Sequence, residues 1–127
     1  MSKSEIIKGK FHRVYIDEEL KSLKRFLRRG NYSSIIILTD STTEQLCLPK
    51  LIELCKLKNF HSLTVTAGEE NKTLASVEKL WEQLLLVADR KSLLINLGGG
   101  MITDIGAFTA SVFKRGIDFV HVPTFIF

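Results

Sequence analysis

The sequence predicts an α/β fold in which a mostly parallel sheet is flanked by helices. Short β-branched or leucine-rich runs alternate with longer amphipathic runs, which is the pattern of strands joined by crossover helices. The run at residues 34–39 (SIIILT) is apolar and β-branched, as a strand covered on both faces is. No internal repeat, low-complexity tract or interior linker divides the 127 residues, so we expect one domain, residues 1–127.

The first half of the chain predicts three strands and two helices. The strands are short β-rich runs, and the helices carry apolar residues at helical spacing. Gly30 and Asn31 end the first helix, and Pro49 makes the second helix irregular. The expected elements are a strand at residues 11–16, a helix at 18–29, a strand at 34–39, a helix at 42–56 and a strand at 61–66.

The second half predicts a helix at residues 71–87, a strand at 93–97, a helix at 101–113 and a strand at 117–122. The first of these helices presents one apolar face, made of Leu74, Val77, Leu80, Trp81, Leu84 and Leu85. Right-handed crossovers make the strands parallel and leave a ligand crevice at their carboxyl ends. We therefore look for function directly after Thr39, Thr66, Leu97 and Val122.

The net charge of +4 does not indicate a nucleic-acid partner. The first 29 residues hold nine of the eighteen basic residues but only four of the fourteen acidic ones, so the rest of the chain is nearly neutral. Such a local excess is typical of a solvated face. No apolar run has the length of a membrane span, and the first ten residues lack the apolar region of a secretory signal. We expect a cytoplasmic protein with no nucleic-acid or membrane partner.

The cysteines and histidines predict no metal site. Cys47 and Cys55 are too far apart along a helix for a disulfide, and we interpret them as reduced core thiols. Each of the three histidines is alone in a strand-like run, without the spacing of a metal-binding motif.

Three glycines, Gly98, Gly99 and Gly100, separate a predicted buried strand from a predicted helix. Without side chains there, a phosphate can approach the backbone N–H groups at the positive end of the helix dipole. The alternative is a tight turn that requires positive φ, and we favour phosphate binding because three glycines exceed what a turn requires. Gly106 permits close packing of the same helix. Asp104 either complements the helix dipole or accepts from a sugar or nicotinamide group.

The other strand ends carry polar residues with two interpretations each. Asp40 is at the position from which an acidic residue of a nucleotide-binding sheet accepts from ribose hydroxyls. From the sequence alone, a role as the N-cap of the next helix explains Asp40 better. The polar composition of the loop that contains Glu69 and Lys72 is explained by its exposure to solvent. Arg115 suits a helix C-terminus but could also clamp a phosphate or carboxylate, and the hydroxyl of Thr124 could face the crevice.

Taken together, these segments resemble the N-terminal NAD-binding domain of the 3-dehydroquinate synthases. Residues 97–124, LGGGMITDIGAFTASVFKRGIDFVHVPT, are similar to that family's LGGGvxxDxxgFxAsxxxRGixfxxvPT signature. Residues 68–72 (GEENK) are similar to its GExxK loop, and residues 39–40 to its first TD. The resemblance covers essentially the whole chain in order and spacing, and it implies a Rossmann-like fold.

The resemblance also implies a role for each matching position. The implied NAD-binding residues are Asp40, Thr42, Glu69, Lys72, Gly99, Gly100, Met101, Asp104 and Thr124. The segment 99–101 would follow the pyrophosphate, with Asp104 on the nicotinamide side, Asp40 and Thr42 at the adenosine ribose, and Glu69 and Lys72 on the adenine side. Arg115 would contact the substrate phosphate, offered across the interface of a homodimer.

By the same resemblance, the full enzyme converts the sugar phosphate 3-deoxy-D-arabino-heptulosonate 7-phosphate to 3-dehydroquinate and phosphate, in the shikimate pathway of aromatic amino acid biosynthesis. NAD transiently oxidises a hydroxyl that a divalent metal, usually zinc, polarises. The family's metal ligands lie in a helical C-terminal domain, which we expect to be missing here. We therefore expect no catalytic residue and no metal ligand in this chain, weak NAD binding and no turnover.

Two positions depart from the family pattern: Phe125 replaces a second Thr that contacts NAD, and Thr103 replaces a usual Gly. The alternatives to a 3-dehydroquinate synthase are a related sugar-phosphate cyclase, a glycerol-dehydrogenase-like metal-dependent alcohol dehydrogenase and a stand-alone nucleotide-binding module.

Overall fold

The computed structural model describes residues 5–8, 13–16 and 20–124. Its main sheet has four strands, β3 (Ile35–Asp40), β4 (His61–Val65), β5 (Leu93–Gly98) and β6 (Asp118–Pro123). All neighbouring strands are parallel, and their order is β4-β3-β5-β6. The expected α/β class with a parallel sheet is therefore confirmed.

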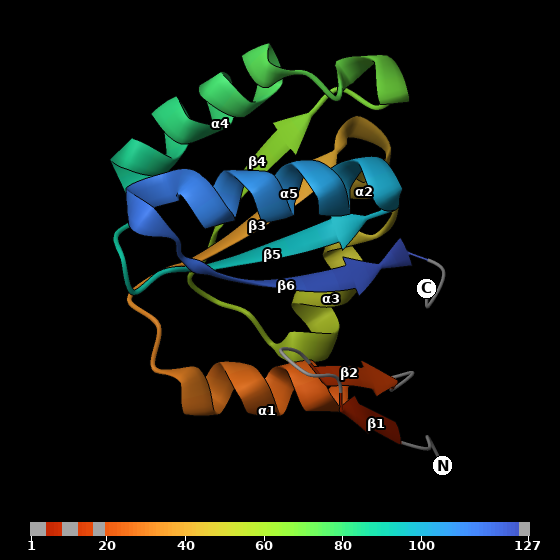
Figure 1. The fold of residues 1–127 in the computed structure, drawn as a ribbon. Coiled ribbons are helices and arrows are strands. Elements are labelled where there is room, and N and C mark those ends of the chain that lie inside the picture. The colour runs from red at the N-terminus through yellow and green to blue at the C-terminus, as the bar shows by residue number, and fades with distance from the viewer. Residues whose placement is uncertain (1–4, 9–12, 17–19, 125–127) are drawn as a thin grey trace.

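Helices cover both faces of this sheet (Figure 1). α4 (Leu74–Val87) and α5 (Gly100–Val112) lie on one face, and α1 (Lys21–Gly30) and α3 (Leu48–Cys55) lie on the other. The short helix α2 (Ser41–Leu46) connects β3 to α3. Parallel strands require such crossover connections, so the alternation that the sequence shows is a direct consequence of the sheet.

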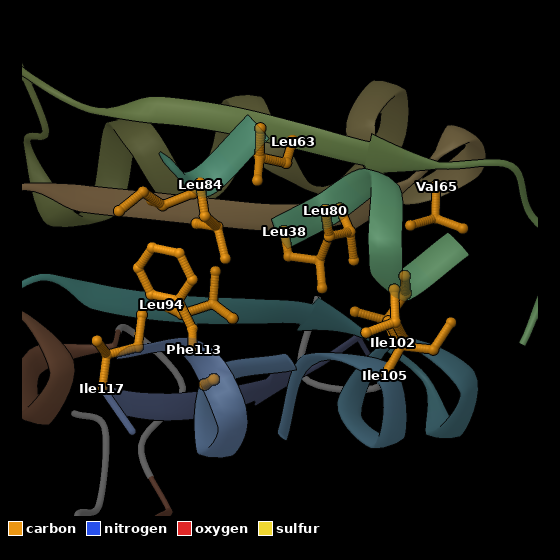
Figure 2. Close-up of a cluster of buried hydrophobic side chains, with 13 residues drawn as sticks. Leu38, Leu63, Val65, Leu80, Leu84, Leu94, Ile102, Ile105, Phe113 and Ile117 are labelled. Carbon is orange, nitrogen blue, oxygen red and sulfur yellow. The ribbon is translucent and has the colours of Figure 1, made fainter. Parts of the chain in front are cut away.

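The central strand β5 separates two apolar cores. All six of its residues are buried. Leu94 packs with Leu84 of α4 and Ile102 of α5 in the cluster that Figure 2 shows. Ile95 points to the other side and packs with Leu51 of α3. Because both faces of the sheet are filled at β5, a ligand can reach this strand only at its end.

The N-terminal residues form a separate antiparallel hairpin of β1 (Glu5–Lys8) and β2 (Arg13–Ile16). β2 confirms the second part of the strand expected at residues 11–16, and β1 was not predicted. The first expected helix is α1, which ends at Gly30 with Asn31 in the left-handed region at φ 49°. Residues 11–12 of the expected strand and residues 18–19 of the expected helix lie outside the described residues.

The helix expected at residues 42–56 is in fact two helices, α2 and α3, which meet at Cys47. Pro49 lies in the first turn of α3 and has no N–H with which to continue a single helix. Cys47 and Cys55 are both buried and free, as expected of core thiols. Burial raises the pKa of the Cys55 thiol to about 11, so this group is not a thiolate at neutral pH.

α4 begins at Leu74, three residues later than expected, because the Thr73 side chain caps it by accepting from the N–H of Ser76 at 3.1 Å. Of its predicted apolar face, Val77, Leu80 and Leu84 are buried. Leu74 and Leu85 are 61% and 62% exposed, so the buried stripe is narrower than predicted.

α5 crosses β5 at close range through a glycine. A Cβ on Gly106 would overlap the side-chain oxygen of Asn96, which lies on β5 and is fully buried. The Asn96 amide cannot move into solvent to make room. This confirms the expectation that Gly106 allows close packing, and it shows that the contact is with the strand.

We predict that Gly106→Ala lowers the free energy of unfolding by about 1 to 3 kcal/mol, because the methyl group overpacks the contact with Asn96. Urea denaturation followed by circular dichroism measures the loss. The matched control is Gly100→Ala in the same helix, where an added Cβ would meet no atom within 4 Å. Equal stability of the Gly106→Ala variant and the unmodified chain would show that the contact imposes no constraint.

Candidate functional site

The carboxyl ends of β3 and β5 lie side by side and carry two of the predicted site segments. The two strands pair from Ile35 with Leu93 to Leu38 with Asn96. Asp40 therefore ends a strand next to the one that leads into the glycine turn, Gly98–Gly100. This adjacency is the basis of the candidate site.

The three glycines of the turn serve different purposes. Gly98 is required by packing, since its Cβ would lie 2.8 Å from that of Ile102. Gly99 and Gly100 have no such neighbour, because an added Cβ would meet nothing within 4 Å. None of the three has positive φ, since only Gly68 and Gly116 do among the glycines that the structure describes. The tight-turn alternative is therefore wrong for this turn.

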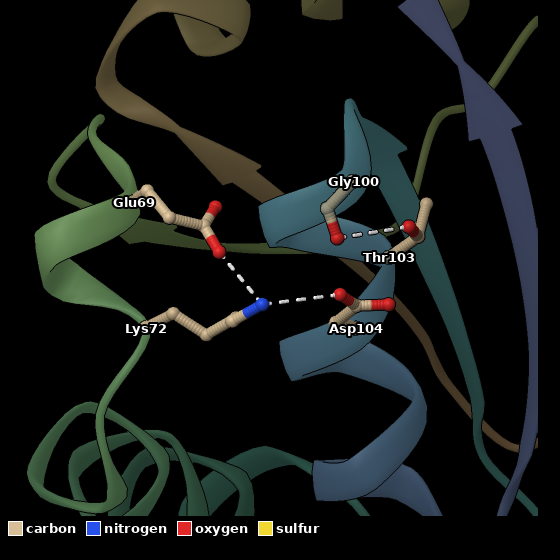
Figure 3. A network of polar contacts seen from close by, with 5 residues as sticks. All are labelled: Glu69, Lys72, Gly100, Thr103 and Asp104. Carbon is tan, nitrogen blue, oxygen red and sulfur yellow. Dashed lines mark hydrogen bonds and ion pairs between the residues drawn. The ribbon is translucent and has the colours of Figure 1, made fainter.

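The space over the turn faces the N-terminus of α5. Gly99 is the N-cap residue and has no side chain with which to cap the helix. The first backbone N–H groups of α5 thus point toward open space at the positive end of the helix dipole, an arrangement that accepts anions. Met101, in the same first turn, packs partly against the core beneath. Thr103, which stands where the resembling family has Gly, donates its hydroxyl to the Gly100 carbonyl at 3.1 Å (Figure 3).

Asp40 caps α2, as the sequence favours. Its Oδ1 accepts from the N–H groups of Thr42 and Thr43, both at 2.8 Å. The Thr43 hydroxyl accepts in turn from the Asp40 N–H at 3.0 Å. Within the described part of the chain no hydrogen bond ends on Oδ2, so the cap leaves one carboxylate oxygen for a ligand.

Glu69, Lys72 and Asp104 form one polar network (Figure 3). The Lys72 ammonium lies 2.6 Å from Glu69 Oε1 and 3.4 Å from Asp104 Oδ2. Hydrogen bonds to Glu69 first and then to Asp104 raise the pKa of Lys72. The three side chains are all largely exposed, so this network is accessible and adds little to stability.

The network borders a shallow hollow of about 270 Å³ between the start of α4 and α5. Apolar side chains form most of its wall, among them Val77, Ile105 and Phe108, with Lys72 and Asp104 at the polar side. The structure therefore brings together residues from the loop after β4 and from α5 that are 32 positions apart in the sequence.

Arg115 is not near these residues. It follows α5, whose thirteen residues span roughly 20 Å, so it lies at the opposite end of the helix from Gly100. Arg115 and Lys114 both have left-handed backbone, at φ 69° and 45°. Gly116 caps the short 3₁₀ turn Phe113–Arg115, not α5 itself as its position suggests. Thr124 follows β6 and is half-buried, and Phe125 lies outside the described residues.

Sequence reasoning did not single out Thr43 or the pair Asn96 and His121. Thr43 donates its hydroxyl to the Leu97 carbonyl at 3.1 Å, directly before the glycine turn. Asn96 Nδ2 lies 3.2 Å from His121 Nδ1, across the pairing of β5 with β6. A polar residue inside a predicted buried strand was the available signal for Asn96, and nothing in the sequence marks Thr43 beyond its place in a cap.

Within the described residues, no three of the His, Cys, Asp and Glu side chains come close enough together to hold a metal ion. In the same part of the chain, no helix has the length and apolar character to cross a membrane.

The sheet order, the crossover helices and the glycine turn define a Rossmann-like α/β domain. A family model described as "3-dehydroquinate synthase N-terminal" matches residues 62–127. Two curated relatives named 3-dehydroquinate synthase are 40% identical: one from Parabacteroides distasonis over 114 residues, 88% of this chain, and one from Campylobacter jejuni over 119 residues, 93% of this chain. The chain belongs to the 3-dehydroquinate synthase family. It spans about a third of each relative's length, 32% in both cases.

Solved structures of two related kinds of synthase share the fold. A 2-deoxy-scyllo-inosose synthase is 28% identical, with a TM-score of 0.81 over 96% of this chain and 36% of its own. A second structure of that enzyme is described as complexed with carbaglucose-6-phosphate, NAD⁺ and Co²⁺. A 2-epi-5-epi-valiolone synthase from Streptomyces hygroscopicus, described with NAD⁺ and Zn²⁺ bound, is 25% identical, with a TM-score of 0.63 over 76% of this chain and 28% of its own.

We predict that the chain loses stability as the pH falls through the range in which His121 takes up a proton. Partial burial lowers the pKa of His121, and the nearby Asp104 only partly opposes this. His121 therefore binds a proton more readily in the unfolded chain than in the folded chain. The free energy of unfolding has its full value above the ordinary histidine pKa of about 6.5 and decreases below it. Urea midpoints between pH 5 and 8 measure the effect.

The control is His121→Gln, which keeps an acceptor for Asn96 but does not titrate in this range. Its stability should decrease less on acidification. Identical pH profiles of the two proteins would contradict the assignment to His121.

Proposed function

We propose that this chain is the NAD-binding part of a 3-dehydroquinate synthase that converts 3-deoxy-D-arabino-heptulosonate 7-phosphate to 3-dehydroquinate and phosphate. One observation carries the proposal: Gly99 and Gly100 are glycines although neither side-chain packing nor backbone conformation requires a glycine there. Space that only a glycine leaves open, over a helix N-terminus, fits the pyrophosphate of a dinucleotide. The family to which the chain belongs supports the choice of reaction.

The chain's residues would bind and orient the dinucleotide. The N–H groups at Gly99, Gly100 and Met101 would hold the pyrophosphate, and the second oxygen of Asp40 would accept from the adenosine ribose, with Thr42 beside it. The chemistry that bound NAD would supply is reversible hydride transfer with the substrate. NAD bound to the related 2-deoxy-scyllo-inosose synthase supports this assignment.

The polar network would lie along the same cofactor. We place Glu69 and Lys72 on the adenine side, Asp104 toward the nicotinamide side, and Thr124 at the end of β6. The Lys72 ammonium lies 3.4 Å from the Asp104 carboxylate. The two side chains can contact opposite halves of an extended dinucleotide only if this contact breaks when NAD binds. Both side chains are exposed to solvent, so breaking their contact costs little free energy.

Substrate and metal would be held largely outside this chain. A divalent ion is named with both solved synthases, Co²⁺ in one and Zn²⁺ in the other. We propose that the metal in this protein is zinc and that its ligands lie in a helical C-terminal domain, which follows the NAD-binding domain of residues 1–127. We also propose a cytoplasmic location, without nucleic-acid or membrane partners. The chain by itself would release no phosphate from the sugar phosphate.

Arg115 would reach the substrate from a second copy. The length of α5 keeps it roughly 20 Å from the glycine turn of its own chain, so a contact with the substrate phosphate requires a homodimer. The strained left-handed backbone at Arg115 supports a functional placement of this side chain.

We predict that Gly100→Ala reduces NAD affinity by about tenfold or more, since its methyl group fills the space over the first N–H groups of α5. Amide chemical-shift titration of the chain with NAD detects even millimolar binding. In the unmodified chain the largest shifts should come from residues 99–101. Ser111→Ala, on the exposed side of α5, is the control and should bind as the unmodified chain does. Shifts confined to other elements would refute the proposed site.

In the whole protein, we predict that Arg115→Ala raises the KM for the sugar phosphate by about tenfold or more while NAD affinity changes little, because a bidentate phosphate contact is lost. Steady-state phosphate release measures KM. The change Arg115→Lys should restore part of the loss. An unchanged KM would remove Arg115 from the substrate site.

A related sugar-phosphate cyclase is the second candidate, because the 2-deoxy-scyllo-inosose synthase superimposes over 96% of this chain. Carbaglucose-6-phosphate, named with that synthase, is a carbocyclic analogue of glucose 6-phosphate. Phosphate release from the heptulosonate phosphate and from glucose 6-phosphate, compared in the whole protein, separates the two candidates. Preference for glucose 6-phosphate would favour the second candidate.

A further inference from the structure

The hydroxyl of Thr43 contacts Leu97, which is 54 residues away in the sequence, and so connects the end of β3 to the end of β5. Oγ1 accepts from the N–H of Asp40 at 3.0 Å and lies 3.1 Å from the carbonyl oxygen of Leu97. The carbonyl of Asp40 is a longer alternative acceptor at 3.4 Å. A hydroxyl has one proton, so the shorter contact assigns that proton to Leu97. Thr43 is 7% exposed, which keeps water from replacing either bond.

This bond lies where the pairing of β3 with β5 ends. The pairing of β3 with β5 extends only to Leu38 and Asn96. Leu97 comes next in β5, and its carbonyl oxygen is bound by a side chain of α2 instead of a backbone N–H of β3. Thr43 thus extends the connection between the two strands by one position.

The backbone of the glycine turn is open at Gly99 and Gly100 and packed at Gly98. Added Cβ atoms at Gly99 and Gly100 would meet nothing within 4 Å, and Gly98 packs against Ile102 of α5. Among the hydrogen bonds of the described residues, the bond to Leu97 is the one that connects the start of the turn to α2 and to the Asp40 cap. Asp40 and the turn are the two anchor points that we assign to NAD, one for ribose and one for pyrophosphate.

We propose that Thr43 is a positioning residue for the NAD site: its hydroxyl fixes the distance between the Asp40 carboxylate and the N–H groups of the glycine turn. This inference rests on the proposed function. A dinucleotide that must engage both points at once binds more tightly when their separation is set beforehand. A ligand that engages only the turn does not depend on that separation.

The test compares Thr43→Val, which keeps the shape but removes the hydroxyl, with Thr43→Ser, which keeps the hydroxyl. Thr109→Val is the matched control, since Thr109 is also buried and its hydroxyl has no hydrogen-bond partner in the described residues. All four proteins are titrated with NAD and, separately, with inorganic pyrophosphate, at a temperature where circular dichroism shows each to be folded. Amide hydrogen exchange is measured in the same samples at Thr103, whose N–H donates to the Gly99 carbonyl at 3.0 Å.

We expect Thr43→Val to lower NAD affinity about tenfold and pyrophosphate affinity much less, with faster exchange at Thr103. The Thr43→Ser and Thr109→Val proteins should resemble the unmodified chain. Equal losses for NAD and pyrophosphate, or no loss with Thr43→Val, would overturn the positioning role. Failure of the unmodified chain to bind NAD would instead overturn the proposed function, and the exchange rates would still show whether Thr43 holds the turn.

Discussion

The passage from β5 into α5 is the constraint on which the rest of the structure depends. The strand is buried on both faces, so the helix must begin immediately at its end and return over the sheet at close range. Two glycines make this possible: Gly98 gives room to Ile102, and Gly106 gives room to Asn96. The direction of α5 follows from these contacts, and with it the direction in which the helix N-terminus points. Gly99 and Gly100 then leave that N-terminus open.

Much of this fold could be predicted from the sequence because its elements are set by local patterns. Apolar runs of β-branched residues gave the buried strands, and Pro49 marked the break that divides one expected helix into α2 and α3. The hairpin partner β1 was missed because a short antiparallel strand has no strong pattern of its own. The exposure of Leu74 and Leu85 was also missed, since helical spacing does not show how wide the covered stripe is.

The site was predictable to the extent that it depends on strand ends. Parallel strands place their carboxyl ends at one edge, so Asp40 and the glycine turn were expected together. Contacts between side chains of distant elements were not predictable: the Lys72 contact with Asp104 and the Thr43 contact with Leu97 depend on how α2, α5 and the loop after β4 pack. Arg115 lies at the far end of α5, so its expected contact with the substrate phosphate depends on a homodimer, which only the resemblance implied.

A crystal structure of the chain soaked with NAD is the most direct test of the central claim that the glycine turn is a dinucleotide-binding site. The account predicts the pyrophosphate within hydrogen-bonding distance of the N–H groups of Gly99, Gly100 and Met101, with the adenosine ribose at the free oxygen of Asp40. NAD bound elsewhere on the sheet, or a pyrophosphate without contact to this turn, would contradict it.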